Sequence, residues 1–305
     1  MILLAGDIML DILLLPELRA AEQATGILLR GGGSAANTAT WVCELGAEAT
    51  LAGCVGNDGI GSMLIRELED SGVRTCVRRV AGAETGCVVV ELSPEGERVM
   101  RSARGANQAL APEDITAAAA ETQPDAVHVT GYALLGPHGL TLLDAAADIA
   151  RGARAYLSFD PSSVGVIRRH GTDRLLATLA DRGVTVLLPN ADEALALAGC
   201  KSIDEAARTL SRAIPAVIVK DGSRGAVVAQ QGEVATVMVT ARPALDSTGA
   251  GDAFDAGVLV GLCRGESLQA ACRLANHAAA RAIAAHGGHP PRAESSGSPD
   301  HAGST

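Results

Sequence analysis

Short apolar runs alternate with alanine-rich stretches of helical periodicity along most of this chain of 305 residues. We predict strands at 2–6, 49–55, 126–130, 155–159, 184–188, 216–220 and 226–229. We predict helices near 35–46, 60–72, 112–121, 138–151, 171–182, 191–198, 203–213, 251–264 and 267–285, with no clear strand between the last two. Because the strands are continuously apolar, the alternation predicts a mostly parallel sheet covered by helices on both faces, an α/β fold of three layers.

Two stretches interrupt this alternation. Residues 12–30 and 84–104 are irregular and include the valine-rich run 86–92, followed by a turn at 93–96. We predict a small β-sheet lid over the carboxyl ends of the strands, where open α/β sheets bind ligands. An edge hairpin with no gating role is the alternative. The main α/β domain then comprises residues 1–11, 31–83 and 105–290, and the tail 291–305, rich in Gly, Pro, Ser and His, is expected to be flexible.

The composition excludes several classes of protein. Hydrophobic residues make up 48% and charged residues 20%, as in an ordinary globular domain, and the net charge of −10 without a basic run argues against a nucleic-acid partner. The 7 cysteines are scattered without a C-x-x-C pair, which favours reduced thiols in a cytoplasmic protein. Asp7 and Asp11 interrupt the first apolar run, so we expect neither a signal peptide nor a membrane span.

The most informative motif is Asp-Ser-Thr-Gly-Ala-Gly-Asp at 246–252, which leads directly into a helix of small residues. The start of a helix has unpaired amide N–H groups and the positive end of the helix dipole, so it can bind an anion. Gly249 and Gly251 allow the backbone to approach that anion closely. Asp252 would then take a proton from a hydroxyl that attacks phosphorus. The alternative is an ordinary capped helix packed against a sheet.

Three further motifs carry candidate chemistry. Glycines 31–33 lead into a helix on which Asn37 offers a donor and an acceptor for hydroxyls, although tight helix packing would also explain them. Asn190 and Glu193 follow an apolar strand and can face one point, where their oxygens suit Mg²⁺; an Asn cap with Glu in the first turn is the alternative. The glycine turn at 220–225 either contacts a nucleotide or only joins two strands.

Taken in order, these motifs resemble the ribokinase-like (PfkB-type) carbohydrate kinase family. The resemblance extends from the opening Gly6-Asp7 to about Pro290. The motifs that carry it are Gly32-Gly33-Ser34-Ala35-Ala36-Asn37, Gly105-Ala106-Asn107, Asn190-x-x-Glu193, Gly222-x-x-Gly225 and Asp246-x-Thr248-Gly249-Ala250-Gly251-Asp252. The resemblance implies an ATP-dependent sugar kinase in which a β lid covers a central α/β domain.

The same resemblance implies roles for individual residues. Asp252 resembles the general base, and the amides of Gly249, Ala250 and Gly251 resemble an anion hole for the transferring phosphate. Residues that resemble contacts to sugar hydroxyls are Asp11, Gly33 and Asn37. Residues that resemble the nucleotide pocket are Asn190, Lys220, Gly222, Gly225 and Asn276. The residues that resemble cation sites are Asn190 and Glu193 for Mg²⁺, through water, and Asp246 and Thr248 for a monovalent cation such as K⁺.

The chain departs from the members of the family that phosphorylate ribose. Those members resemble it but carry a Lys where this chain has Ser34, and an acid where it has Thr130-Gly131-Tyr132, so ribose is not favoured. The 5 aromatic residues leave little for stacking a nucleoside base, which favours a sugar or a sugar acid. A nucleoside kinase of the same fold and a non-catalytic sugar- or nucleotide-binding regulator remain the alternatives, and the retained Asp252 argues against the regulator.

Two other nucleotide-binding folds lack their motifs in this sequence. The first strand leads to Gly6-Asp7-Ile8 instead of the G-x-G-x-x-G of a dinucleotide-binding oxidoreductase, and no G-x-x-x-x-G-K-[ST] of a P-loop enzyme is present. We therefore expect a small-molecule sugar as the partner, with no nucleic acid and no membrane. Members of the resembled family often form a homodimer through the lid.

Overall fold

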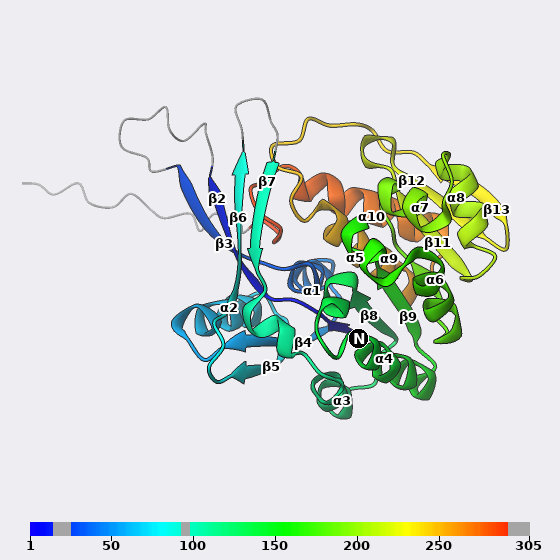
Figure 1. Ribbon diagram of the computed structural model, residues 1–305. Coiled ribbons are helices and arrows are strands. Elements are labelled where there is room, and N and C mark those ends of the chain that lie inside the picture. Colours follow the sequence, from blue (N-terminus) through cyan, green and yellow to red (C-terminus); the bar gives the residue numbers. More distant parts are fainter. Residues whose placement is uncertain (15–25, 93–97, 292–305) are drawn as a thin grey trace, which may run out of the picture.

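The structure is a computed structural model that describes residues 1–14, 26–92 and 98–291. Parts of both predicted lid segments (15–25 and 93–97), including the predicted turn at 93–96, lie outside the described residues, as does nearly all of the predicted tail, from 292 to 305. Figure 1 shows a broad central sheet between two layers of helices, with a second, smaller sheet that projects beyond it.

The central sheet has nine strands in the order β13-β12-β11-β10-β9-β8-β1-β4-β5. It is parallel from β11 to β5, and the β11–β12 and β12–β13 pairs are antiparallel. The strands are β1 (Ile2–Ala5), β4 (Ala49–Gly56), β5 (Arg74–Val80), β8 (Ala126–Thr130), β9 (Tyr156–Asp160), β10 (Val186–Leu187), β11 (Ala216–Lys220), β12 (Ala226–Gln230) and β13 (Glu233–Val237).

Helices cover both faces of this sheet, as predicted. One layer consists of α3 (Pro112–Ala120), α4 (Gly139–Ala153), α5 (Val164–His170), α6 (Thr172–Asp181), α7 (Ala191–Ala198) and α8 (Ile203–Leu210). The other consists of α1 (Ser34–Glu44), α2 (Gly59–Asp70), α9 (Ala250–Cys263) and α10 (Leu268–Ala282). Alternate residues of β1 pack into the two hydrophobic cores, because successive side chains of a strand point to opposite faces. Leu3 packs into the core beneath the first layer of helices, and Ile2 and Leu4 pack into the core beneath the second.

The smaller sheet, here called the lid sheet, has the order β3-β2-β6-β7. Its strands are β2 (Met9–Leu14), β3 (Ile27–Gly32), β6 (Gly86–Leu92) and β7 (Arg98–Ala103). The β2–β6 pair is parallel and the other two pairs are antiparallel. The prediction that the two irregular stretches contribute strands to a small separate sheet is confirmed.

The sequence pattern missed β5 and β13, which are the two edge strands of the central sheet. Most residues of β5 are exposed or half-buried, and arginines occupy positions 74, 78 and 79. An edge strand pairs with only one neighbouring strand, so it does not need a continuous apolar run. The predicted strand at 184–188 is shorter, Val186–Leu187, and the predicted helix at 171–182 begins at Thr172, after α5, which the sequence pattern did not predict.

Three short 3₁₀ helices follow strand ends: η2 (Gly105–Ala109) after β7, η3 (Gly131–Leu135) after β8 and η4 (Gly222–Arg224) after β11. The buried carboxamide of Asn107 in η2 accepts from the Ile8 amide at 2.9 Å and donates to the Ile8 carbonyl at 2.9 Å. Asn107 thereby ties the end of the lid sheet to the segment that follows β1. The carboxyl ends of the parallel strands and the lid sheet therefore face one region of the molecule.

Candidate active site

The start of α9 opens into this region. Gly249 precedes α9 with φ of 72°, and a Cβ there would lie 2.3 Å from Gly288 Cα, so only glycine fits. The Ala250 amide donates to the Ser247 carbonyl at 3.3 Å. The amides that follow belong to the first turn of a helix, which offers them no backbone acceptor of its own. The dipole and the amides at this start of α9 favour negative charge nearby, and the anion hole expected from the glycine motif stays a prediction.

Asp252 lies in the first turn of α9 and is held by two neutral donors from α1. Its carboxylate accepts from Ser34 Oγ at 2.7 Å and from Asn37 Nδ2 at 2.7 Å. Burial raises the pKa of Asp252 to about 7, although the two hydrogen bonds favour the ionised form. A carboxyl with a pKa near neutrality can accept a proton and release it again, which is the requirement for a general base.

A cavity of about 360 Å³, here called the lid cavity, separates Asp252 from the lid sheet. Three predicted sugar contacts line it together with Asp252: Asp11, Gly33 and Asn37. The Oδ1 atom of Asn37 is buried and has no hydrogen-bond partner among the described residues, so it can accept from a bound hydroxyl. Burial raises the pKa of Asp11 to about 7, and the neighbouring charges of Asp7 and Asp252 add to this rise.

The lid cavity continues into a middle cavity of about 280 Å³, which shares Ser34 and Tyr132 with it. Asn190 and Glu193, from the start of α7, line the middle cavity. The two form a capping box, in which Asn190 N donates to Glu193 Oε2 at 2.9 Å and Glu193 N donates to Asn190 Oδ1 at 3.0 Å. The structure therefore contains the helix cap that was the alternative interpretation of Asn190 and Glu193. The same two side chains line the middle cavity.

Glu193 is only 2% exposed, and burial raises its pKa to about 7; the charge of Asp160 adds to the rise and that of Lys220 opposes it. Within residues 1–14, 26–92 and 98–291, no group of three or more His, Cys, Asp or Glu side chains could hold a metal ion by itself. Carboxylate and amide oxygens facing a polar cavity fit Mg²⁺, which keeps several waters and takes few protein ligands.

A buried charge cluster lies behind the middle cavity. Lys220 Nζ, at the end of β11, contacts Asp160 Oδ2 at 3.2 Å and the two carboxylate oxygens of Asp255 at 3.0 and 3.1 Å. Burial opposes the charge of Lys220, but the two carboxylates outweigh it and raise the pKa of Lys220. Lys220 holds the pKa of Asp160 low against its burial, whereas burial raises the pKa of Asp255 well above its usual range. Lys220 is therefore the shared partner of both carboxyl groups in this cluster.

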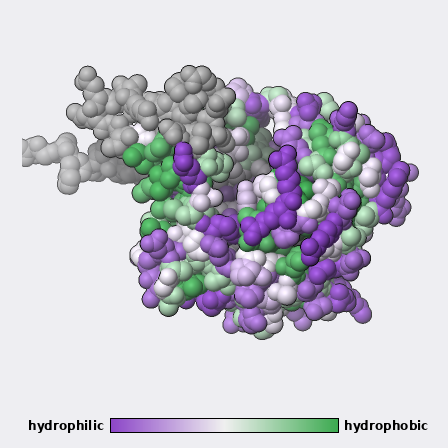
Figure 2. All heavy atoms as spheres, in the orientation of Figure 1, coloured by the Kyte–Doolittle hydropathy of each residue, from purple (hydrophilic) through white to green (hydrophobic). Residues whose placement is uncertain are grey.

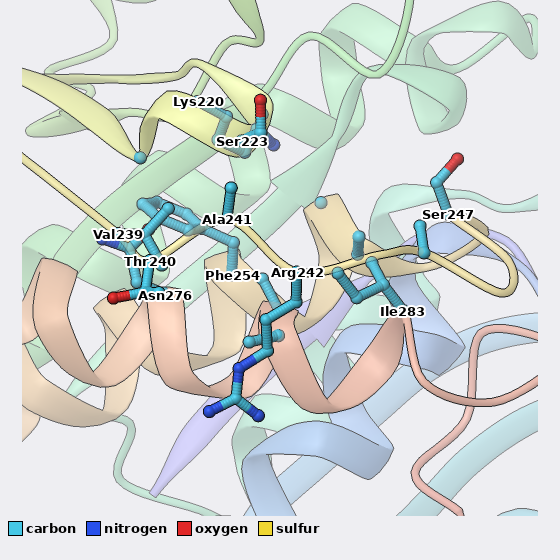
Figure 3. Close-up of a pocket in the computed structure, with 17 residues that line it drawn as sticks. Lys220, Ser223, Val239, Thr240, Ala241, Arg242, Ser247, Phe254, Asn276 and Ile283 are labelled. Atoms are coloured by element: carbon cyan, nitrogen blue, oxygen red, sulfur yellow. The ribbon is translucent and has the colours of Figure 1, made fainter.

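The third space, here called the outer cavity, has a volume of about 260 Å³ and shares Lys220, Gly222 and Gly251 with the middle cavity. The other predicted nucleotide contacts, Gly225 and Asn276, also line it. Figure 3 shows Lys220 and Ser223 above this cavity and Asn276 and Ile283 below it. The three cavities therefore form one continuous cleft that passes the start of α9.

Gly225 also has a structural reason to be glycine. Its φ is 99°, and a Cβ there would lie 2.1 Å from the carbonyl oxygen of Val237. Phe254, expected to be buried in a helix, is only 4% exposed but contributes to the wall of the outer cavity. The walls of this cavity are mostly apolar, which suits a flat ring system.

Asp246 and Thr248, the predicted ligands of a monovalent cation, lie in the loop before α9. Asp246 Oδ1 accepts from Thr248 N at 2.9 Å and from Thr248 Oγ1 at 2.7 Å, and its Oδ2 accepts from Gly287 N at 3.0 Å. Asp246 is only 3% exposed, and Thr248 lines the lid cavity. The pair fixes the loop that precedes Gly249 and links it to residues near the end of the described chain.

Several residues of the cleft were not assigned a role from the sequence: Asp7, Ser34, Arg104, Tyr132 and Asp160. Nor was Asp255, which lies behind the middle cavity. Asp7 follows β1, Asp160 ends β9 and Lys220 ends β11. The rule that ligands bind at the carboxyl ends of parallel strands could have selected these positions. The same rule selects Tyr132, two residues after β8, whereas no comparable signal in the sequence distinguishes Arg104.

Among the described residues, no helix is long and apolar enough to cross a membrane.

Comparison with known proteins extends these observations. The model of the family described as pfkB family carbohydrate kinase matches residues 1–294. A fructokinase from Klebsiella pneumoniae is 32% identical over 268 residues, which are 84% of this chain and 82% of that protein. An uncharacterized sugar kinase from Archaeoglobus fulgidus is 30% identical over 80% of this chain and 94% of that protein. The crystal structure of adenosine kinase from Sinorhizobium meliloti superposes with a TM-score of 0.85 at 27% identity and covers 95% of each chain.

Proposed function

The chain belongs to the pfkB family of carbohydrate kinases, and from this premise we propose that it transfers the terminal phosphoryl group of ATP to a hydroxyl of a sugar or sugar acid. Membership of the family makes the protein a phosphotransferase that acts on a sugar hydroxyl. The finer assignment rests on one observation above the others: Asp252 lines the lid cavity in the first turn of α9, with neutral donors alone on its carboxylate and a pKa near 7.

In this proposal the acceptor sugar binds in the lid cavity with its reactive hydroxyl at Asp252. Asp252 removes the hydroxyl proton as the oxygen attacks the terminal phosphorus of ATP, whose bond to the bridging oxygen breaks so that ADP leaves. Ser34 and Asn37 orient the carboxylate, because each donates to one of its oxygens at 2.7 Å. Asp11, Gly33 and Asn37 bind the other hydroxyls. The backbone of Gly249, Ala250 and Gly251 at the helix start stabilises the charge that develops on the phosphoryl oxygens.

We assign the outer cavity to the nucleotide, with Lys220, Gly222, Gly225 and Asn276 as its contacts. The middle cavity then holds the phosphates, since it joins the outer cavity to Asp252. Asn190 and Glu193 hold Mg²⁺ there through water, and the bound ion supplies positive charge to the phosphate oxygens. We further propose that Asp246 and Thr248 bind K⁺ or a similar monovalent cation, because a buried carboxylate and a hydroxyl supply the oxygen ligands that it takes.

A sugar is a better acceptor for this cavity than a nucleoside. Tyr132 is the one aromatic residue among the described residues that line the lid cavity, and a purine base needs aromatic faces on which to stack. The similarity to adenosine kinase keeps the nucleoside kinase as the second candidate. A non-catalytic regulator is a weaker candidate, because it has no use for a carboxyl tuned to a pKa near 7 at the start of α9.

The decisive experiment is a screen of phosphoryl acceptors with Mg·ATP over pentoses, hexoses, sugar acids and nucleosides. Turnover of a sugar or sugar acid, at a rate well above that of any nucleoside, supports the proposal. Preference for a nucleoside would replace it with the second candidate. Tight binding of a sugar without any turnover would favour the regulator.

We propose in addition that the segments 12–30 and 84–104 act as a lid over the acceptor and that two copies of the chain dimerise through it. The edge strand β3 exposes 52% of Ile27 and 53% of Leu29, and Figure 2 shows hydrophobic residues gathered on that side of the molecule. Exposed apolar side chains on an edge strand favour association. Light scattering after size exclusion tests this: we expect a dimer mass for the wild type and a monomer mass for Leu29→Glu.

A further inference from the structure

Arg104 is a basic residue of the lid cavity, and the proposed function gives it no task. It follows β7, where the chain leaves the lid sheet, and it lines the lid cavity together with Met100 and Ser102. Met100 and Ser102 are two residues apart, so the same face of β7 presents both to the cavity, and Arg104 lines it just beyond the end of the strand. The backbone at Arg104 is fixed, because its carbonyl accepts from the amide of Asn107 at 3.1 Å and from its side chain at 3.0 Å.

The guanidinium of Arg104 has unused hydrogen-bonding capacity. Its Nε atom is buried and has no hydrogen-bond partner, and the structure gives the side chain no ion pair with a described carboxylate. A buried donor without a partner is unfavourable unless a ligand or water satisfies it. A guanidinium presents five N–H donors in a planar fork that matches two oxygens of a carboxylate or a phosphate.

The carboxylates in the same cavity leave room for an anion. Asp7, Asp11 and Asp252 line the cavity with Arg104, yet burial raises the pKa values of Asp11 and Asp252 to about 7 and raises that of Asp7, which the charge of Arg104 in turn lowers. At neutral pH Asp11 and Asp252 are therefore partly protonated, which reduces their repulsion of a negative ligand. Their oxygens suit hydroxyl groups, and Arg104 is the complementary group for an oxyanion.

Arg104 does not belong to the ATP side of the cleft. The middle cavity is lined by Lys220 and the outer cavity by Lys220 and Arg242, and Arg104 lines neither. An anion bound by Arg104 is therefore part of the molecule in the lid cavity, not a phosphate of the nucleotide.

We infer that the acceptor is a sugar that carries an oxyanion, a carboxylate or a phosphate ester, and that Arg104 binds this group at the lid end of the cavity. The inference rests on the proposed function, since it names the class of molecule that presents its hydroxyl to Asp252. The oxyanion and the phosphorylated hydroxyl are then bound by different residues of the lid cavity, Arg104 and Asp252. Arg104 thereby selects the substrate without touching the atoms that react.

The test compares three forms of one hexose as acceptors with Mg·ATP: the neutral aldose, its aldonic acid and its terminal phosphate ester. For the wild type we expect kcat/KM at least about 10-fold higher for one of the two anionic forms than for the aldose. Arg104→Gln should raise KM for that form by about 10- to 100-fold, because it removes a charged hydrogen bond, and should leave kcat within about 3-fold. The acceptor whose KM rises in Arg104→Gln, the aldonic acid or the phosphate ester, identifies the oxyanion.

Two further variants control the test. Arg101→Gln removes an arginine from the same strand at an exposed position, out of step with the residues that line the cavity, and should leave all three KM values unchanged. Arg104→Lys keeps the positive charge but loses the planar pair of N–H donors. Its KM for the anionic form should therefore lie between those of the wild type and Arg104→Gln. Unchanged thermal unfolding and unchanged ATP affinity in Arg104→Gln show that the variant is folded.

The failure of this inference can be distinguished from the failure of the proposed function. If the aldose is the best acceptor and Arg104→Gln changes KM equally for all three forms, the inference is wrong. The proposal that the protein is a sugar kinase is not affected by that result. If none of the three is phosphorylated, calorimetry of the aldonic acid and the phosphate ester decides. Binding to the wild type that Arg104→Gln weakens at least 10-fold supports the role of Arg104, and equal binding or no binding to both proteins overturns it.

Discussion

Two buried acidic sites lie three residues apart in α9, around Asp252 and around Asp255, and they differ in the groups that contact the carboxyl. Asp252 accepts from a hydroxyl and an amide, both uncharged, and lines a cavity. Asp255, three residues later, is fully buried and contacts the ammonium of Lys220, which also contacts Asp160. Burial raises the pKa of both Asp252 and Asp255. Burial alone therefore does not distinguish a reactive carboxyl from a structural one.

The groups that contact each carboxyl distinguish Asp252 from Asp255. A carboxyl held by neutral donors keeps its charge unbalanced, so its protonation responds to a substrate that enters the cavity. A carboxyl in a cluster with lysine is already compensated, and removing the lysine would leave charge buried without a partner. We therefore expect changes at Asp252 to affect turnover with little effect on folding, and changes at Lys220 to affect folding first.

The largest effect is expected for Asp252→Asn. Loss of the general base should reduce kcat by roughly 10²-fold or more, while the affinity for ATP, measured by calorimetry, stays nearly unchanged. Thermal unfolding of the variant should remain close to that of the wild type, because asparagine has the same shape. Equal turnover in the two proteins would remove Asp252 from the mechanism.

Lys220→Met is expected to destabilise the fold by about 3–5 kcal/mol, because it leaves the carboxyls of Asp160 and Asp255 without their cation. Equilibrium unfolding in urea measures the change in the free energy of unfolding. The chain offers a matched control, since its one other lysine, Lys201, is exposed, and Lys201→Met should change stability by less than about 0.5 kcal/mol. A stable Lys220→Met protein would show that the cluster does not depend on the ion pair.

The pH dependence of turnover distinguishes the two clusters again. Because the pKa of Asp252 is about 7, kcat/KM should fall by about 10-fold per pH unit as the pH drops below 7 and the base becomes protonated. The effect on stability has the opposite sign: a carboxyl whose pKa is raised on folding contributes most at low pH, and its contribution is lost as the pH rises from about 4 to about 7.

The measurement is a pH–rate profile between pH 5.5 and 9 for the wild type and Asp11→Asn. Burial also raises the pKa of Asp11 to about 7, so the two groups titrate together in the wild type. If Asp252 is the base, the acid limb persists in Asp11→Asn at a slightly shifted midpoint. Disappearance of the limb in that variant would assign the titration to Asp11 and not to Asp252.

The sequence predicted one cluster far better than the other. Glycines 249 and 251 before Asp252 carry a local signal, because only a few residue types permit a helix start open to an anion. The Asp160–Lys220–Asp255 cluster has no local signal, since its members come from β9, β11 and α9 and meet only after the sheet forms. The same reasoning separates the confirmed central strands, which are continuous apolar runs, from the missed edge strands β5 and β13.

Asn190 and Glu193 are the case in which the sequence left two interpretations open: the structure contains the cap, and the Mg²⁺ site stays a proposal for the same side chains. The capping box fixes the two side chains to each other, and the same side chains line the middle cavity. The double change Asn190→Ala with Glu193→Ala should therefore cost about 0.5–2 kcal/mol of stability, as loss of a helix cap does. If the pair also organises Mg²⁺, the change should raise the Mg²⁺ concentration for half-maximal activity several-fold.

A matched cap separates the two effects. Ser267 caps α10 by accepting from the Ala270 amide at 3.3 Å, at an exposed position that contributes to none of the three cavities of the cleft. Ser267→Ala should lower stability by a similar amount and leave the Mg²⁺ titration unchanged, because only the cap is lost. If the double variant also gives an unchanged titration, the pair is a cap and nothing more. A shift in the double variant alone means that the buried carboxyl of Glu193 acts on the metal as well as on its helix.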